Sequence, residues 1–239
     1  MQKSNLELWN RFQKYQTIYP ELGMSLDISR INFPDDWFEA MSGPLQRAFE
    51  AIGALEQGSI ANPDENRMVG HYWLRNSKLA PTAEIREEIE LTCKAIQQFC
   101  QEIHNGNVKG SAGIYKNLLI IGIGGSALGP QFVSHALGNP TTDKLRVLFF
   151  DNTDPDGMDK VLSELGSELG QTLCIVISKS GGTKETRNGM LEAEAAYKQA
   201  GLNFGAHTVA ITGAGSELDR YAVKNSWLRR FPMWDWVGG

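Results

Sequence analysis

The sequence predicts an α/β protein in which a helical N-terminal segment precedes a doubly wound parallel sheet. Three observations predict this fold class. Apolar residues before about residue 112 recur at helical spacing, short apolar runs alternate with helical patterns after it, and glycine-rich loops follow two of those runs. We therefore expect two parts, a helical segment over 1–111 and a sheet domain over 112–239.

Three amphipathic helices are predicted in the N-terminal segment. The first carries Leu6, Trp9 and Phe12 at helical spacing, and the second runs over 34–55. The third begins at Thr82, which acidic residues follow, and ends near Asn105. Residues 71–75 are expected to form a short buried helical segment between the second and third helices.

Four short apolar runs after residue 112 predict strands that are buried on both faces. They are Asn117–Gly122, Leu145–Phe150, Thr172–Ser178 and His207–Thr212. Helical patterns at about 127–137, 155–169 and 184–200 connect them. Right-handed crossovers make these strands parallel, and ligands of such sheets bind beyond the carboxyl ends of the strands.

The loop after the first predicted strand is rich in glycine. GIGGSALGP at 122–130 places backbone N–H groups and a helix N-terminus where they can face an anion. The pattern Gly122-x-Gly124-x-x-Ala127 also fits the dinucleotide fingerprint, with Asp151 after the next strand where a ribose-binding acid would stand. A nicotinamide-dependent oxidoreductase is therefore one candidate, and a tight turn without a ligand is another.

The loop after the third predicted strand has the chemistry of a phosphate site. In SKSGGTKET at 178–186, the first six residues combine three hydroxyls, a lysine and two glycines ahead of a helix. A phosphate dianion binds short hydroxyl donors, loop amides and one compact positive charge, whereas a helix cap needs a single hydroxyl and no lysine. We predict a phosphate site built from Ser178, Lys179, Ser180 and Thr183. A nucleotide P-loop is not indicated, because G-x-x-x-x-G-K-[ST] does not occur.

Composition and charge exclude several classes of protein. The 239 residues are 41% hydrophobic and 21% charged, which is typical of a globular protein with a packed core. Lys and Arg number 23 against 28 Asp and Glu, a net charge of −5. We therefore expect neither nucleic acid nor an anionic membrane as a partner, and an anionic ligand must be bound by local donors.

The cysteines and the first residues favour a cytoplasmic protein. Cys93, Cys100 and Cys174 contain no CxxC pair, so neither a disulfide framework nor a zinc site is predicted. MQKSNLELWNRFQ lacks the apolar core of a secretion signal, and no stretch approaches the roughly 20 apolar residues that span a bilayer. Cys93 and Cys100 fall on one predicted helix, and we expect them to be small core residues.

The remaining polar candidates are interpreted as structural residues. The histidines show no paired metal-ligand spacing and are expected on the surface or in packing; they are His71, His104, His135 and His207. The acids between 151 and 159 resemble a calcium loop only loosely and precede a helix, where acids are common. We therefore expect no metal site among these residues.

Four collinear blocks resemble the glucose-6-phosphate isomerase family. They are GIGGSALGP at 122–130, DNTDPDGM at 151–158, SKSGGTKETRN at 178–188 and MWDWVGG at 233–239. The stretch NRMVGHYWLR at 66–75 is similar to the long bacterial form. The resemblance implies a sugar isomerase (SIS) domain over 112–239, with a flavodoxin-like fold, in a cytoplasmic enzyme of glycolysis and gluconeogenesis.

The resemblance also implies roles for individual residues. Glucose 6-phosphate and fructose 6-phosphate would be interconverted by ring opening and a cis-enediolate, without a metal or redox cofactor. Glu185 corresponds to a glutamate that supports the ring-opening histidine, although it could equally be an acid stabilised by a helix N-terminus. The residues implied to bind the phosphate and the sugar are Gly125, Ser126, Ser178, Lys179, Ser180 and Thr183.

The catalytic set of the family is implied to lie beyond Gly239. In the family, DWVGG is followed by an arginine, a glutamate base, a histidine supplied across a homodimer interface, and a lysine. The tail over 231–239 is apolar where chain ends are usually polar, which favours a core cut short. We expect an N-terminal fragment that binds the sugar phosphate and lacks turnover alone. The alternative is a non-catalytic SIS sugar-phosphate sensor.

Overall fold

The computed structural model describes residues 4–237, and the chain divides into two compact units, Met1–Gly53 and Ala54–Gly239. This division differs from the predicted boundary at 111/112. The reason is the helix α3 (Ala83–His104), whose Phe99 and Ile103 pack in one cluster with Leu173 and Val209 of the sheet. The helix therefore belongs to the same unit as the sheet.

The first unit contains a β-hairpin that the sequence analysis missed. Helix α1 (Asn5–Tyr15) leads into β1 (Gln16–Tyr19), which pairs antiparallel with β2 (Met24–Asp27). A short 3-10 turn (Pro20–Leu22) and Gly23, at φ 61°, connect the strands. The expectation of an entirely helical N-terminal segment was therefore wrong here, because β-branched and aromatic residues followed by proline and glycine favour a hairpin.

Helix α2 (Trp37–Glu56) begins in the first unit, and the second unit then continues with short elements. A second unpredicted hairpin pairs β3 (Ile60–Asn62) with β4 (Arg67–Met68). The 3-10 helices η2 (His71–Leu74) and η3 (Ser77–Leu79) follow, and Trp73 is fully buried, as expected for residues 71–75. Thr82 caps α3 by accepting a 3.3 Å hydrogen bond from the Ile85 amide, and Asn105 ends it, which confirms the third predicted helix.

Five parallel strands form the sheet of the second unit, in the order β6-β5-β7-β8-β9. Four of them confirm the predicted strands, and β9 was not predicted. The strands are β5 (Asn117–Ile121), β6 (Arg146–Phe150), β7 (Thr172–Ser178), β8 (Thr208–Thr212) and β9 (Arg229–Pro232). Numbered along the chain this order is 2-1-3-4-5, which is the flavodoxin-like doubly wound topology.

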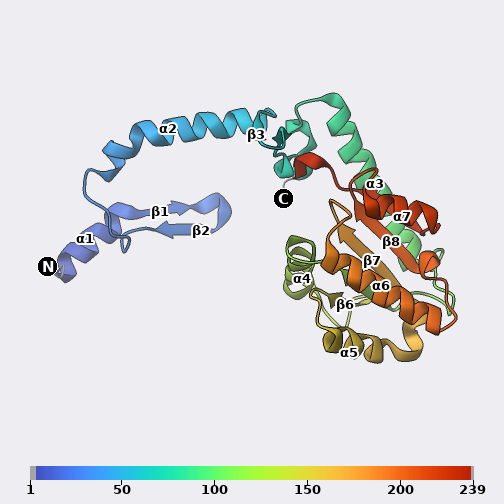
Figure 1. Cartoon of the computed structure of the whole chain (residues 1–239). Helices are drawn as coiled ribbons and strands as arrows, with labels where there is room; N and C mark the ends of the chain where they lie inside the picture. The colour runs from blue at the N-terminus through green and yellow to red at the C-terminus, as the bar shows by residue number, and fades with distance from the viewer. Residues whose placement is uncertain (1–3, 238–239) are drawn as a thin grey trace. The chain divides into compact units, whose positions relative to one another are not determined.

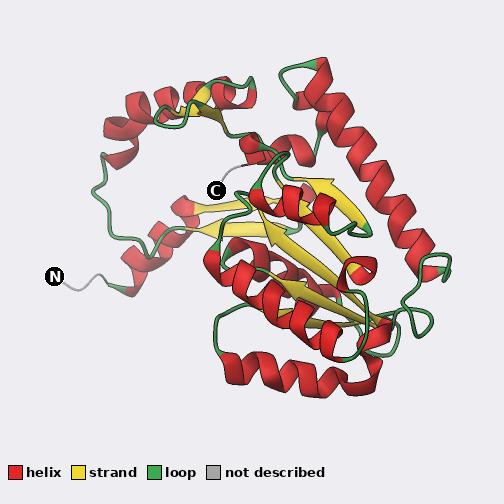
Figure 2. Ribbon diagram, turned by 45° about the vertical axis from the view of Figure 1, so that its right-hand side comes forward, coloured by secondary structure: helices red, strands yellow, loops and turns green. Residues whose placement is uncertain are grey.

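Helices cover both faces of this sheet (Figures 1 and 2). They are α4 (Gly125–Leu137), α5 (Pro155–Leu165), α6 (Lys184–Gln199) and α7 (Glu217–Lys224). Leu119, Ile121 and Val176 share a buried cluster with residues of α5, α6 and α7. The alternate residues Leu118 and Ile175 face the cluster that contains α3. Because strand residues alternate between the faces, both sides of the sheet are apolar.

Two of the three cysteines lie where the sequence analysis did not place them. Cys93 and Cys100 are exposed on α3, so the expectation that they are core residues was wrong. Phe99 and Ile103 take the sheet-facing positions of that helix instead. Cys174 is buried in β7, and burial raises the pKa of its thiol to about 12. A thiol in such a site is an inert packing group.

His207 is a packing residue, as predicted, and its tautomer follows from its neighbours. The Ser111 amide donates a 3.3 Å hydrogen bond to Nε2, so Nε2 acts as an acceptor. Nδ1 therefore carries the proton and faces the Thr172 carbonyl at 3.2 Å. Burial lowers the pKa of His207, which keeps the imidazole neutral.

The two longest helices, α2 and α3, have 20 and 22 residues. Charged residues occur along both of these helices. Across residues 4–237, no helix combines the length and the apolar character that a membrane span requires. Within the same residues, no three His, Cys, Asp or Glu side chains gather in a group that could hold a metal ion.

Candidate anion site at the centre of the sheet

The two glycine-containing loops leave the sheet side by side. Strands β5 and β7 are neighbours, with Ile121 paired to Val176, so the loops that follow them start at the same edge. The chain after β5 continues into α4, whereas the chain after β7 continues into α6, which packs on the opposite face. The structure therefore places both loops at the topological switch point, where doubly wound sheets bind ligands.

The first loop turns sharply into α4. Gly124, at φ 56°, is the N-cap residue of α4 and provides no side chain to cap the helix. A Cβ atom on Gly122 would lie 2.9 Å from the Ser126 Cβ, so the first turn of α4 packs closely on the end of β5. Gly125 and Ser126 consequently lie in this first turn, where the helix dipole favours an anion.

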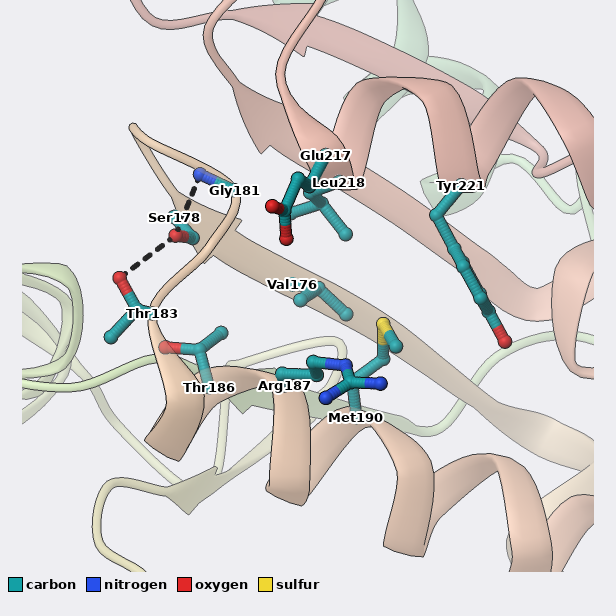
Figure 3. A pocket seen from close by; sticks show the side chains of 10 residues that line it. All are labelled: Val176, Ser178, Gly181, Thr183, Thr186, Arg187, Met190, Glu217, Leu218 and Tyr221. Atoms are coloured by element: carbon teal, nitrogen blue, oxygen red, sulfur yellow. Dashed lines mark hydrogen bonds between the residues drawn. The ribbon is translucent and has the colours of Figure 1, made fainter.

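Hydrogen bonds among its own residues organise the second loop. The Ser178 side chain, 4% exposed, lies at the end of β7, and its hydroxyl donates to Thr183 Oγ1 at 3.1 Å. The Gly181 amide donates to Ser178 Oγ at 3.1 Å, and the Gly182 amide donates to Ser180 Oγ at 3.3 Å (Figure 3). The hydroxyls predicted to bind phosphate therefore lie within one compact turn.

The start of α7 supports this turn from the other side. The Lys179 carbonyl accepts a 3.0 Å hydrogen bond from the Gly213 amide. Gly181 has φ 71°, and a Cβ atom there would lie 2.6 Å from the Leu218 amide nitrogen and 2.7 Å from Ser216 Oγ. Only glycine fits this close approach. The position of the second loop is therefore fixed by backbone contacts with a segment about 35 residues further along the chain.

The N-terminus of α6 lacks a side-chain cap. Thr183 is its N-cap residue, but Thr183 Oγ1 accepts from Ser178 and forms no capping hydrogen bond. Glu185 is exposed in the first turn. Helix N-termini carry partial positive charge and unsatisfied N–H groups, so the arrangement suits a phosphate better than a capped helix would.

A cavity of about 80 Å³ opens between the second loop, α6 and α7 (Figure 3). Ser178, Gly181 and Thr183 line it, and Gly125, Ser126, Lys179 and Ser180 do not. Its other lining residues were not among the predicted site residues; they are Val176, Thr186, Arg187, Met190, Glu217, Leu218 and Tyr221. Thr186 belongs to the loop sequence SKSGGTKET, which was predicted to bind phosphate, whereas no feature of the sequence linked Glu217 to the site.

Tyr221 forms the wall of this cavity furthest from the loop. Its hydroxyl donates a 2.7 Å hydrogen bond to Glu194 Oε2. Burial raises the pKa of Tyr221 to about 12, and the bond to Glu194 acts in the same direction. Tyr221 is therefore a neutral donor that holds Glu194 rather than a group that exchanges protons near neutral pH.

The acids after β6 have structural partners. Asp151 Oδ2 accepts a 2.6 Å hydrogen bond from Gln131 of α4, and Oδ1 accepts one from Asn152. Asp154 caps α5 by accepting from the Asp156 amide. Asp151 thus ties α4 to the end of β6, and the prediction of acids at a helix start is confirmed for Asp154.

Most of the chain, from within α2 to beyond β9, matches a family model. That model is described as phosphoglucose isomerase and matches residues 39–239, which include both loops. The chain belongs to the phosphoglucose isomerase family. Membership confirms the family resemblance that the four sequence blocks indicated.

Individual members of the phosphoglucose isomerase family are closely similar to this chain. A glucose-6-phosphate isomerase of Geotalea daltonii is 61% identical over 99% of the chain, and one of Geobacter sulfurreducens is 60% identical over 98%. The crystal structure of a glucose-6-phosphate isomerase from Chlamydia trachomatis superposes with a TM-score of 0.79 at 28% identity and covers 96% of the chain. The match covers 44% of each of these three proteins, so the chain spans less than half their length.

Proposed function

We propose that this chain provides the sugar-phosphate-binding part of a glucose-6-phosphate isomerase. The observation that carries the proposal is the uncapped α6 N-terminus behind the Ser178–Thr183 turn, located at the switch point of a phosphoglucose isomerase family sheet. The whole enzyme interconverts glucose 6-phosphate and fructose 6-phosphate by ring opening and proton transfer through a cis-enediolate. Within the second unit, the sugar-phosphate-binding part begins at about residue 112, and α3 packs on its sheet.

Within this proposal the second loop binds the phosphate. The phosphate oxygens accept hydrogen bonds from the hydroxyls of Ser178, Ser180 and Thr183, and Lys179 adds a compact positive charge. Gly125 and Ser126 in the first turn of α4 face the sugar from the neighbouring loop. The N-termini of α4 and α6 then both face the bound sugar phosphate. A chain with net charge −5 can therefore bind a phosphate ester through local donors.

Phosphate binding by the second loop contributes to catalysis by orienting the substrate. Binding energy gained at the phosphate fixes the sugar against the groups that move protons, which raises the effective concentration of those groups. Glu185 is proposed to support the ring-opening histidine, and no other residue of this chain is assigned to the proton transfers. We place the whole enzyme in the cytoplasm as a homodimer, and the reaction needs no cofactor.

Fructose 6-phosphate is expected to bind the chain and raise its Tm, whereas fructose and NAD leave the Tm unchanged. Ser178→Ala should weaken fructose 6-phosphate binding about tenfold, because it removes one hydroxyl donor to a charged oxygen. Isothermal titration calorimetry measures the affinity. Ser163→Ala, on the exposed face of α5, is the matched control and should bind as the unchanged chain does. Stabilisation by NAD instead would favour the oxidoreductase.

The 239 residues alone are expected to show no fructose 6-phosphate to glucose 6-phosphate turnover in a coupled assay. A chimeric protein, in which residue 239 is fused to the region that follows the matched segment in the Geotalea daltonii relative, should convert fructose 6-phosphate to glucose 6-phosphate. Robust turnover by the 239 residues alone would contradict the proposal that groups outside these residues carry out the proton transfers. A chimera that binds fructose 6-phosphate without turnover would favour the sugar-phosphate sensor.

A further inference from the structure

Thr186 carries a buried hydroxyl that the proposed phosphate site does not use. The residue is 4% exposed, lies in the first turn of α6 and lines the cavity beside the second loop. Its Oγ1 atom is buried and has no hydrogen-bond partner. Buried hydroxyls nearly always have a partner in folded proteins, so an orphan at the edge of an anion site suggests that the partner arrives with the ligand.

The spacing of Thr183 and Thr186 is that of a reciprocal helix cap. Thr183 is the N-cap residue, and Thr186 follows it by three, the position from which a side chain reaches back toward the N-cap. Both halves of such a cap form at α1, where Ser4 and Glu7 bond each other reciprocally. At α6 Thr183 forms no capping bond, because its oxygen accepts from Ser178 instead.

Binding of an oxyanion changes the hydrogen bonds that these hydroxyls can form. To donate to a phosphate oxygen, the Ser178 hydroxyl must turn away from Thr183 Oγ1. Thr183 Oγ1 then loses the donor it has in the free chain while its own hydrogen turns to the anion. The orphan Thr186 hydroxyl lies in the first turn of α6, three residues after Thr183, and Figure 3 shows the Thr183 and Thr186 side chains following one another at the start of this helix.

We propose that Thr186 is a positioning residue of the phosphate site, whose hydroxyl replaces Ser178 as the donor to Thr183 Oγ1 when a phosphate ester binds. The inference rests on the proposed function and extends it to a residue that does not touch the ligand. The exchange lets Ser178 and Thr183 both donate to the anion without leaving Thr183 Oγ1 unsatisfied. Thr186 thereby fixes the orientation of the Thr183 hydroxyl in the bound state.

Thr186→Val separates this role from a purely structural one. The substitution keeps the shape and removes a hydroxyl that has no partner in the free chain, so the Tm without ligand should stay the same or rise. Affinity for fructose 6-phosphate, measured by calorimetry, should fall about tenfold. Thr186→Ser restores a hydroxyl and should recover most of that affinity. Inorganic phosphate, used as a second probe, should follow the same order.

Thr208→Val is the matched control, because Thr208 is a buried threonine whose hydroxyl donates to the Phe204 carbonyl at 2.6 Å. This variant should lower the Tm and leave the affinity unchanged. Unchanged fructose 6-phosphate affinity in Thr186→Val, with binding by the original chain intact, overturns the inference alone. A lower Tm at unchanged affinity also overturns it, since Thr186 would then be structural. Absence of binding by the original chain overturns both the inference and the proposed function.

Discussion

Gly181→Ala is expected to abolish measurable fructose 6-phosphate binding and to lower the free energy of unfolding by about 2–4 kcal/mol. Two costs combine. Gly181 has φ 71°, a conformation that alanine adopts only with strain. The new Cβ atom would also lie 2.6 Å from the Leu218 nitrogen and 2.9 Å from the Glu217 nitrogen, and backbone atoms at a helix start cannot rotate away.

Relief of this clash must displace the turn that holds the hydroxyls. The Gly181 amide donates to Ser178 Oγ, so any shift of Gly181 breaks the bond that orients Ser178 toward Thr183. Binding should consequently fall more than the loss of a single hydroxyl would cause. Both effects are measured on the same protein, by urea unfolding and by calorimetry with fructose 6-phosphate.

The adjacent glycine provides a control of identical chemistry. A Cβ atom on Gly182 would meet only the flexible Glu217 carboxylate, at 3.6 Å, and this glycine does not have positive φ. Gly182→Ala should therefore change the free energy of unfolding by less than about 1 kcal/mol and keep fructose 6-phosphate binding. Equal behaviour of the two variants would show that α7 does not fix the second loop.

The sheet and its two loops were predictable because local signals there agree with the tertiary structure. Each predicted strand is a short, largely apolar run, and in a sheet covered on both faces most positions of such a run are buried or partly buried. Ser178 and Thr183 belong to one loop, so their proximity follows from sequence alone. The switch-point position followed from chain order and crossover handedness.

Features that depend on packing between distant segments were not predictable. β9 carries Arg229 and Arg230 next to Phe231, and only Phe231 is buried, so this edge strand lacks a continuous apolar run. The cavity walls contributed by α7 depend on the Gly181 contact, and periodicity does not encode that contact. The exposed positions of Cys93 and Cys100 depend on the rotation of α3 against the sheet.

The apolar tail was interpreted from sequence as a core cut short, and the described residues give it partners. Trp236 packs on Trp73 with ring centroids 5.2 Å apart, and the Trp236 carbonyl accepts a 2.7 Å hydrogen bond from the Gly70 amide. Trp234 stacks on Trp236 and donates through Nε1 to Glu88 Oε2 at 2.8 Å. The tryptophans of the tail thus have partners between Gly70 and Glu88, in the segment after β4 and in the first turns of α3.

Trp73→Ala is expected to be the most destabilising single substitution in this cluster, by about 3–5 kcal/mol. The Trp73 side chain is fully buried, and its indole Nε1 donates to the Glu56 carbonyl at 3.0 Å. Gly70 has no side chain where the indole lies, since a Cβ atom there would overlap Trp73 Cε3. Alanine would therefore leave a large cavity and an unpaired carbonyl.

Trp73→Phe separates these two costs, because it fills much of the cavity and still lacks the indole N–H. It should destabilise the chain by less than Trp73→Ala does, while Leu74→Ala, at a neighbouring position that is 39% exposed, should cost less than about 1 kcal/mol. Urea unfolding followed by tryptophan fluorescence measures all three. The contrary result is that Trp73→Ala lowers the free energy of unfolding no more than Leu74→Ala does. That result would show that burial of Trp236 does not depend on the Trp73 indole, and that Glu88 and the Gly70 amide hold the tail.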